Sequence, residues 1–359
     1  MKVFFDYSIF TLQSFGGVSK YTVNLVENFS DQVNRLIISP LYKNYYLKNC
    51  NFADKMIFYN KAGPLVKYVN KFNKIYFNYK LKTKKPDIIH LSYFNEKNFY
   101  DSKAKIVITE HDLIKEKFYP ERYQDQIEYK KKLYEKIDQI ICVSYNTKKD
   151  LQQEYNVDPT KISVVHHGVN KSKDVRERSL NIRPFILYVG SRQRYKNFNN
   201  VIKSYASSAK LKSDFDFVCF GGGKFLRTEE NFFKDLSINR DRIHYFEGDE
   251  LDLNYFYQNA RVFIFPSIYE GFGMPLLEAM NMDCPVICSD IGSFSEIVND
   301  AAIFFNPTDT ESIKHKMENS IFDDQLLINL KKKGNRNINR YSWKKCSNET
   351  EKIYKEILT

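Results

Sequence analysis

The chain has 359 residues, of which 43% are hydrophobic and 28% charged, with 13 Gly and 10 Pro. This length suits two ordinary domains, and the composition excludes a disordered or fibrous chain. The formal net charge of +11 is uneven, because residues 1–170 hold 27 Lys and Arg against 18 Asp and Glu, whereas the remainder holds 28 against 26.

Short β-branched runs alternate with longer helical patterns along the whole chain. The alternation predicts an α/β protein with two parallel sheets, each in a Rossmann-like domain. The predicted strands are Lys2–Phe5, Arg35–Ile38, Asp87–His90, Lys105–Thr109, Gln139–Val143 and Lys161–Val165 in the first half, and Phe185–Val189, Asp216–Phe220, Ile243–Phe246, Val262–Phe265, Pro285–Cys288 and Ala302–Phe304 in the second.

The domain boundaries follow from the segments between these elements. The charged stretch Lys171–Pro184 has no apolar period and is predicted to be the interdomain linker. We therefore expect an N-terminal domain at 1–170 and a C-terminal domain at 171–341. Residues 342–359 have an apolar pattern typical of a helix that docks back on the N-terminal domain.

The cysteines and the apolar runs indicate in which cellular compartment the protein is expected. No apolar run is long enough to span a membrane, and the first residues do not form a secretory signal. The six cysteines have no CxxC spacing, and Cys142, Cys219 and Cys288 lie inside predicted strands. We expect buried, reduced thiols in a cytoplasmic protein, rather than disulfides or a metal site.

The densest cluster of candidate functional residues follows the predicted strand Val262–Phe265 and reads Glu-Gly-Phe-Gly-Met-Pro-Leu-Leu-Glu over 270–278. The glycines let the backbone approach a ligand, and Pro275 is expected at the first position of a helix whose N-terminus suits phosphate. Glu270 is expected to accept hydrogen bonds from sugar hydroxyls, and Glu278, in the first helical turn, from a ribose. Alternatively, Glu278 only favours the helix dipole.

A second cluster follows the strand Phe185–Val189, where Gly190 precedes three cations, Arg192, Arg194 and Lys196. Parallel sheets bind ligands beyond the carboxyl ends of their strands, so this loop is expected at the same sheet edge as Glu270. Cations there suit a diphosphate and a negatively charged leaving group. The alternative is an exposed basic loop.

The N-terminal half offers two weaker signals. Gly16 and Gly17 precede a helical run and could cradle a phosphate or a sugar. His111 follows the strand Lys105–Thr109 and could hydrogen-bond to a sugar hydroxyl, although a structural role is an equal alternative. The remaining histidines near strand ends lack metal-ligand spacing, so no metal site is predicted.

Together these motifs resemble the GT4 family of retaining glycosyltransferases. The likeness rests on the E-x7-E pattern of Glu270 and Glu278, on Gly190 with Lys196-Asn197, and on His111-Asp-Leu. Gly16-Gly17-Val-Ser-Lys-Tyr is similar to the mannosyltransferase-like branch. Two positions depart from the family pattern, because Ser191 stands where many relatives have arginine and Asp283 where they usually have glycine. Asp tolerates the left-handed turn expected there.

The resemblance implies a GT-B fold, with two Rossmann-like domains facing each other across a cleft. It implies an acceptor held mainly by the N-terminal domain, a nucleotide-sugar donor held mainly by the C-terminal one, and metal-independent transfer with retention. Its residue roles are catalytic for Glu270, His111, Lys196 and Arg192, and donor-binding for Gly16, Gly17, Gly190, Arg192, Lys196, Glu270, Gly271, Phe272, Gly273, Met274 and Glu278.

The substrates are less sharply implied. The branch resemblance favours GDP-mannose as the donor, with UDP-sugars as an alternative. The acceptor implied is a saccharide, typically lipid-linked, in surface polysaccharide assembly such as lipopolysaccharide O-antigen or capsule. A dinucleotide-dependent oxidoreductase is disfavoured, because the GxGxxG fingerprint fails at Gly221-Gly222-Gly223. The remaining alternatives are a GT-B sugar-nucleotide epimerase and a catalytically silent subunit of a glycan-assembly complex.

The excess positive charge lies largely in residues 43–85, which hold eleven lysines and a single acid, Asp54. Within residues 64–86, apolar residues recur from Leu65 to Tyr79 at helical spacing, accompanied by lysines. Such a helix could lie peripherally on an anionic membrane surface, at the inner face of the plasma membrane. The alternative is a helix packed on its own sheet with a solvated lysine face. Nucleic-acid binding is not predicted, because no known binding module accompanies the charge.

Overall fold

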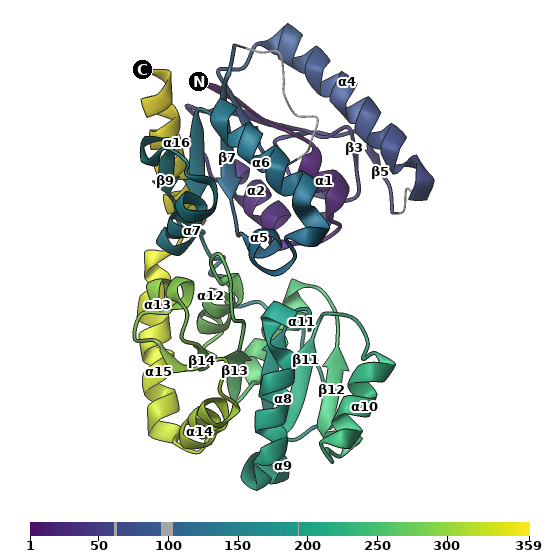
Figure 1. Ribbon diagram of the computed structural model, residues 1–359, viewed down its shortest axis with the longest axis vertical. Helices are drawn as coiled ribbons and strands as arrows, with labels where there is room; N and C mark the ends of the chain where they lie inside the picture. Colours follow the sequence, from purple (N-terminus) through teal and green to yellow (C-terminus); the bar gives the residue numbers. More distant parts are fainter. Residues whose placement is uncertain (61–62, 95–102, 193) are drawn as a thin grey trace. The chain divides into compact units, whose positions relative to one another are not determined.

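The computed structural model describes residues 1–60, 63–94, 103–192 and 194–359 (Figure 1). The chain divides into two compact units. The N-terminal unit contains Met1–Gly168 together with Tyr341–Thr359, and the C-terminal unit contains Val169–Arg340. The chain therefore passes between the units twice, at 168–169 and at 340–341.

A parallel sheet forms the centre of the N-terminal unit. Its described strands have the order β4-β2-β1-β6-β7-β8-β9, and every pairing is parallel. The strands are β1 (Lys2–Phe5), β2 (Asn34–Ile38), β4 (Ala53–Asp54), β6 (Ile88–Leu91), β7 (Lys105–Glu110), β8 (Gln139–Cys142) and β9 (Ile162–Val164). A separate short pair joins β3 (Leu41–Tyr42) to β5 (Ile57–Phe58).

Helices connect these strands and cover the sheet. They are α1 (Ser8–Leu12), α2 (Gly17–Glu27), α3 (Tyr45–Lys48), α4 (Val66–Lys84), α5 (Ile114–Phe118), α6 (Gln124–Lys136) and α7 (Tyr145–Tyr155). The C-terminal helix α16 (Trp343–Leu358) belongs to the same unit and packs on α2. It buries Trp343, Cys346, Ile353 and Tyr354, four of the five apolar residues that formed its sequence pattern.

The C-terminal unit has its own parallel sheet, with the described strands in the order β12-β11-β10-β13-β14-β15. The strands are β10 (Phe185–Val189), β11 (Asp216–Phe220), β12 (Ile243–Phe246), β13 (Val262–Phe265), β14 (Val286–Ser289) and β15 (Ala302–Phe305). Its helices are α8 (Phe198–Ser207), α9 (Ala209–Asp214), α10 (Arg227–Asp235), α11 (Glu250–Asn259), α12 (Met274–Asn281), α13 (Gly292–Val298), α14 (Thr310–Ile321) and α15 (Asp324–Asn337).

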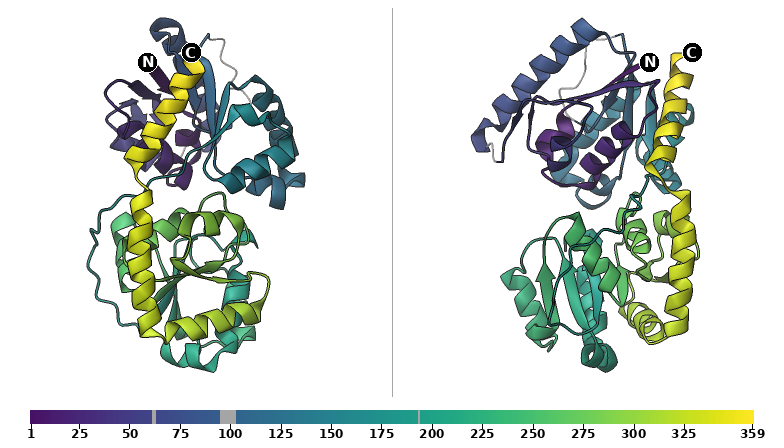
Figure 2. Two further views of the ribbon diagram at one scale, coloured as in Figure 1. Left: turned by 90° about the vertical axis from the view of Figure 1, so that its left-hand side faces the viewer. Right: turned by 180° about the vertical axis from the view of Figure 1, so that it is seen from behind.

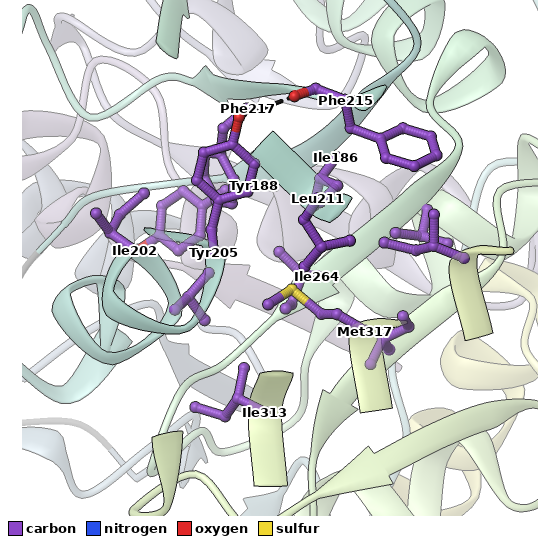
Figure 3. Close-up of a cluster of buried hydrophobic side chains, with 14 of the residues drawn as sticks. Ile186, Tyr188, Ile202, Tyr205, Leu211, Phe215, Phe217, Ile264, Ile313 and Met317 are labelled. Carbon is purple, nitrogen blue, oxygen red and sulfur yellow. Dashed lines mark hydrogen bonds between the residues drawn. The ribbon is translucent and has the colours of Figure 1, made fainter. Parts of the chain in front are cut away.

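The core of this unit explains why its strands read as continuous apolar runs. Side chains such as Ile186, Phe217 and Ile264 leave one face of the sheet and meet apolar side chains of α8 and α14 (Figure 3). Tyr205 is fully buried in this cluster, and its hydroxyl donates to the carbonyl of Phe215 at 2.8 Å, which satisfies its polar end. With both faces of the sheet covered, polar residues gather in the loops at the strand ends.

The predicted strands are all present, each within one residue of its predicted bounds. The strands that the sequence did not reveal are β3, β4 and β5, each of two residues, which is too short for an alternating pattern to show. Asp283 adopts the expected left-handed turn, with φ of 56°. All six cysteines are buried and outside any disulfide.

The structure corrects the prediction that residues 171–184 form a solvated linker. Residues 171–184 form no helix or strand, but they lie along the surface of the C-terminal unit (Figure 2). Arg176 pairs with Asp249 and Asp252 at 2.7 and 2.6 Å, and Arg178 pairs with Asp252 at 2.6 Å. Its charged residues, which suggested a solvated linker, instead fasten the segment to α11.

Candidate active site

Two loops meet at the carboxyl edge of the C-terminal sheet, one after β10 and one after the neighbouring strand β13. The backbone N–H of Ile268 donates to the carbonyl of Tyr195 at 2.8 Å and so joins the two loops directly. Lys196, in the short 3-10 turn Arg194–Lys196, places its Nζ 2.5 Å from Oε1 of Glu270. The structure thus brings together the lysine and the glutamate that the sequence singled out.

The two carboxylate oxygens of Glu270 have different surroundings. Ser267 donates its hydroxyl to Oε1 at 2.7 Å, so the lysine and the serine share one oxygen. No described residue donates to Oε2. The lysine and glutamate side chains are 15% and 14% exposed, so a ligand can reach them. Ser267 is a residue that sequence reasoning missed, although it stands three positions before Glu270.

The glycine loop leads into α12 as expected, with two corrections. The helix begins at Met274, so Pro275 is its second residue rather than its first. Glu278 is then the fifth residue and lies beyond the first turn, which weakens the interpretation that it only favours the helix dipole. Gly271 and Phe272 are buried, and no side chain caps the helix N-terminus.

Gly273 is a position where only glycine fits well. Its φ is 105°, and a Cβ there would lie 2.9 Å from Leu276 Cδ1 and 3.0 Å from Phe294 Cε1. The first turn of α12 therefore follows a backbone turn that no other residue makes easily. This end of the helix carries partial positive charge and suits an anion.

Arg192 occupies a different environment from Lys196. Its guanidinium donates to the carboxylate of Glu229 and to the carbonyls of Gly221 and Gly223, the latter at 2.8 Å. The side chain is only 4% exposed. Arg192 thus joins the loop after β10 to the glycine turn after β11, and this engagement favours a supporting role over contact with a ligand.

The glycine turn at 221–223 is a second feature that the sequence did not reveal. All three glycines have φ between 76° and 82°. A Cβ on Gly222 would lie 2.5 Å from the carbonyl oxygen of Gly190. Gly190 itself has φ of 116°, and its N–H donates to the carbonyl of Phe220 at 2.9 Å. The turn therefore holds the backbone just after β10 in place.

In the N-terminal unit, Gly16 and Gly17 lie where α2 begins, and Gly16 is the residue before the helix. The side chain of Gln13 folds against Gly16 and accepts a hydrogen bond from the N–H of Ser19 at 3.3 Å. A Cβ added to Gly17 would have no neighbouring atom within 4 Å. The pair therefore leaves open backbone at the N-terminus of α2.

His111 follows β7, and its ring lies edge to face against those of Tyr21 and His167. Its ring centroid is 4.9 Å from that of Tyr21 and 5.4 Å from that of His167. Desolvation by burial lowers the pKa of His111 to about 3, so the imidazole is neutral at physiological pH. No described residue hydrogen-bonds to its ring nitrogens. A neutral imidazole can both donate to and accept from a hydroxyl group.

A buried chain of hydrogen bonds lies behind His111. Tyr354 of α16 bonds to Nδ1 of His90, and Nε2 of His90 lies 2.9 Å from the hydroxyl of Thr109. Thr109 in turn lies 3.1 Å from the hydroxyl of Tyr21, whose ring contacts His111. The C-terminal helix therefore contributes to the environment of the histidine, a connection that sequence spacing could not reveal.

The surface of α4 contradicts the interpretation of its apolar series as a core face. Tyr68, Phe72, Ile75 and Tyr79 are all exposed, Tyr68 by 69%, and the buried residues are Asn73, Phe77 and Leu81. Leu65, just before the helix, is exposed as well. The helix therefore packs through one face and presents an aromatic stripe on another.

Several lysines accompany this stripe. Lys67, Lys71 and Lys82 are exposed, and with Lys74 they recur at helical intervals beside the stripe. Lys80 instead pairs with Asp54 at 2.8 Å. No helix in the described part of the chain is long and apolar enough to cross a membrane.

Two family models together match residues 15–337. The model Glycosyltransferase Family 4 matches residues 15–173, and the model Glycosyl transferases group 1 matches residues 171–337. The chain belongs to the GT4 glycosyltransferases. In this GT4 chain the boundary between the two matches falls within a few residues of the boundary between the two compact units.

One curated relative is the O-antigen chain mannosyltransferase RfbU of Salmonella typhimurium, which is 32% identical over 219 residues. The match covers 59% of this chain and only 60% of that protein. Sucrose-phosphate synthase from Thermosynechococcus elongatus has a TM-score of 0.77 at 17% identity, covering 99% of this chain and 98% of that one. HepE of Anabaena, solved in complex with UDP-glucose, has a TM-score of 0.75 at 14% identity, covering 99% of both chains. The predicted GT-B fold is confirmed.

Proposed function

We propose that this GT4 chain is a retaining glycosyltransferase that moves a hexose from a nucleotide sugar to a saccharide acceptor. The observation that carries the proposal is the pairing of Lys196 with Glu270 next to the uncapped N-terminus of α12. A cation and a helix N-terminus suit the diphosphate, and a carboxylate with one unoccupied oxygen suits the sugar hydroxyls.

In the proposed reaction the bond between the anomeric carbon and the diphosphate oxygen breaks, and the bonding electrons leave with the nucleoside diphosphate. The acceptor hydroxyl forms the new bond on the same face and releases its proton, which the leaving phosphate oxygen takes up. Lys196 and the N-terminus of α12 stabilise the negative charge that develops on the leaving group. No metal ion is needed in this scheme, because these groups supply the positive charge.

The other residues have supporting roles in this proposal. Glu270 and the backbone of residues 272–274 hold the donor sugar, Glu278 holds the ribose, and Gly16 and Gly17 give backbone contacts to the donor. His111, neutral at physiological pH, hydrogen-bonds to the reacting sugar. Arg192 positions the loop that carries Lys196 rather than contacting the diphosphate itself.

We favour GDP-mannose as the donor, because the Salmonella relative is an O-antigen chain mannosyltransferase. HepE was solved with UDP-glucose, and UDP-sugars are therefore the alternative. By the same argument the acceptor is a saccharide, lipid-linked, in the assembly of a surface polysaccharide. These choices rest on relatives whose length the chain matches only in part.

The test is a thermal-shift panel of GDP, UDP and their sugars, since a ligand that binds only the folded state raises the apparent stability. We expect a GDP-sugar to raise Tm most, with transfer that persists in EDTA and a product that retains the anomeric configuration by NMR. Activity that vanishes in EDTA and returns with manganese would overturn metal independence. Epimerised nucleotide sugar formed without an acceptor would favour the epimerase instead.

We also propose that α4 docks the protein peripherally on an anionic membrane, at the inner face of the plasma membrane. Aromatic residues of its exposed stripe suit the headgroup region, and each nearby lysine adds about 1 kcal/mol of attraction. We expect co-sedimentation with phosphatidylglycerol vesicles that weakens at raised salt. Lys71→Glu and Ile75→Ser should each weaken it, whereas Lys132→Glu and Leu226→Ser, at exposed positions elsewhere, should not. Equal binding to neutral vesicles contradicts the proposal.

A further inference from the structure

The N-terminal unit contains a pocket of about 420 Å³ at the carboxyl edge of its sheet, within the size range of small-ligand sites. It is closed on one side by α1, and its other walls come from Tyr93 and Phe94, just after β6, and from helices α4, α5 and α6. The residues that matter for its chemistry are Asn70, Tyr93, Phe94, Lys115, Gln126 and Tyr129.

The walls of this pocket combine aromatic surface with polar groups. Tyr93 and Phe94 lie edge to face, with ring centroids 5.9 Å apart, and Tyr129 adds a third ring. Lys115 donates to the hydroxyl of Tyr93 at 2.7 Å and to Oε1 of Gln126 at 2.8 Å. It forms no ion pair with any described carboxylate. The ammonium group is therefore held in place by neutral partners.

Asn70 gives the sharpest clue to the ligand. Its Oδ1 is buried and accepts no hydrogen bond in the described part of the chain. A buried carbonyl oxygen without a donor destabilises the folded protein, so such an atom indicates a missing donor. An amide oxygen accepts only, and hence the missing group must be an O–H or N–H.

These features together select the chemistry of the ligand. An apolar chain leaves Asn70 Oδ1 without a donor and the third N–H of the Lys115 ammonium without an acceptor, and an anion such as phosphate offers lone pairs to an oxygen that needs a donor. A sugar ring suits all three features of the pocket. Its hydroxyls can donate to Asn70 Oδ1 and accept from Lys115, and its C–H face packs on the aromatic rings. Burial lowers the pKa of Lys115, and the charges around it are mixed, since Lys130 lowers this pKa further whereas Asp112 and Glu116 raise it. The pocket is therefore not a strongly cationic site.

We infer that this pocket binds a neutral pyranose of the acceptor, with Asn70 accepting from one ring hydroxyl and Lys115 donating to another. The inference rests on the proposed function and names the part of the N-terminal unit that holds the acceptor. Asn70 lies on the side of α4 opposite Phe72, about half a helical turn away around the axis. A sugar in the pocket would then lie behind the helix whose outer face we propose to contact lipid.

The probe for this inference is methyl α-D-mannopyranoside, observed on the full chain by saturation-transfer-difference NMR. Asn70→Leu and Lys115→Met are the test variants. Asn78→Leu, on the same helix outside the pocket, and Lys131→Met, exposed on α6, are the matched controls. We expect at least a fivefold loss of saturation transfer in both test variants and none in the controls. Asn70→Leu should fold at least as stably as the parent, because it removes an unsatisfied buried oxygen.

The transfer reaction gives a second readout that separates the two proposals. With a soluble saccharide acceptor, the pocket variants should raise the acceptor KM at least tenfold while the KM for the donor stays within twofold. Unchanged acceptor KM with intact transfer overturns the pocket inference and leaves the proposed function standing. Pyranoside binding without any nucleotide-sugar binding overturns the proposed function alone. Displacement of the pyranoside by millimolar inorganic phosphate contradicts a neutral ligand.

Discussion

The substitution Lys196→Met is the most informative perturbation of the candidate site. It keeps much of the apolar stem and removes the ammonium group, whose Nζ lies 5.4 and 5.1 Å from the ring centroids of Tyr195 and Phe265. Glu270 then keeps its hydrogen bond from Ser267 but loses the cation at 2.5 Å. The variant therefore removes the group that we propose to meet the diphosphate, with little change in packing.

Lys196→Met is expected to lower catalytic efficiency much more than it lowers stability. Loss of one charged contact to a transition state costs about 2–4 kcal/mol, which corresponds to about a 30- to 1,000-fold drop in kcat/KM. Loss of a charge-assisted hydrogen bond in the folded protein costs about 1.5–3 kcal/mol, and partial solvation of this pair places it at the low end. For a unit of this size 1 kcal/mol lowers Tm by about 2–4 °C. At 25 °C the variant should thus remain folded.

The assay measures hexose transfer at 25 °C together with Tm. Lys203→Met, an exposed lysine on the neighbouring helix α8, is the matched control and should change neither quantity. Transfer within threefold of the parent would show that the lysine does not meet the leaving group. A fall in activity that matches the unfolded fraction would assign the lysine to folding rather than to catalysis.

Three further predictions concern the rest of the site. Glu270→Gln should lower kcat, whereas Glu278→Ala should mainly raise the donor KM, because a ribose contact changes little during reaction; equal effects of both on KM alone refute this division. Arg192→Lys should lower the Tm of the C-terminal unit, since the single ammonium nitrogen of lysine cannot reach all the acceptors that Nε, Nη1 and Nη2 of Arg192 serve, namely Glu229 and the carbonyls of Gly221, Gly223 and Lys224; a Tm within 1 °C of the parent contradicts the supporting role. The free energy of unfolding should fall as pH drops below about 6.5, because the unfolded chain binds protons that folded His90 and His111, with pKa values lowered to about 3 by burial, and folded His167 do not; His111→Asn should reduce this slope without abolishing it in urea titrations at pH 5, 6 and 7.5.

The sequence predicted the strands and the clusters at their carboxyl ends because both depend on local pattern. Buried parallel strands are short apolar runs, and the residue after each run lies at the ligand edge whatever the rest of the chain does. The pairing of Lys196 with Glu270 followed, since β10 and β13 are neighbours in the sheet. The start of α12 was displaced by one residue because proline is tolerated anywhere in the first turn.

Residues that depend on distant partners could not be assigned in this way. Arg192 was grouped with Lys196 by proximity in sequence, yet its partner Glu229 lies on α10 and engages its guanidinium. The surroundings of His111 include Tyr354, which is more than 200 residues away on α16. Such contacts arise from tertiary packing, and no spacing rule encodes them.

The orientation of α4 also depends on a tertiary contact that the sequence did not reveal, and it bears on the proposed membrane contact. An apolar stripe on a surface helix normally faces the core, and the series from Leu65 to Tyr79 therefore left two orientations open, toward the sheet or toward a membrane surface. Asn73 decides between them, because its side chain accepts from the N–H of Leu41 at 3.0 Å and donates to the carbonyl of Leu41 at 2.8 Å. This paired contact is made to β3, a strand too short to predict, and it fixes the rotation of the helix with Phe77 inward. Because the contact between Asn73 and Leu41 orients the helix, the aromatic stripe remains exposed. An exposed aromatic surface that the fold holds in place is typical of a surface that binds a partner.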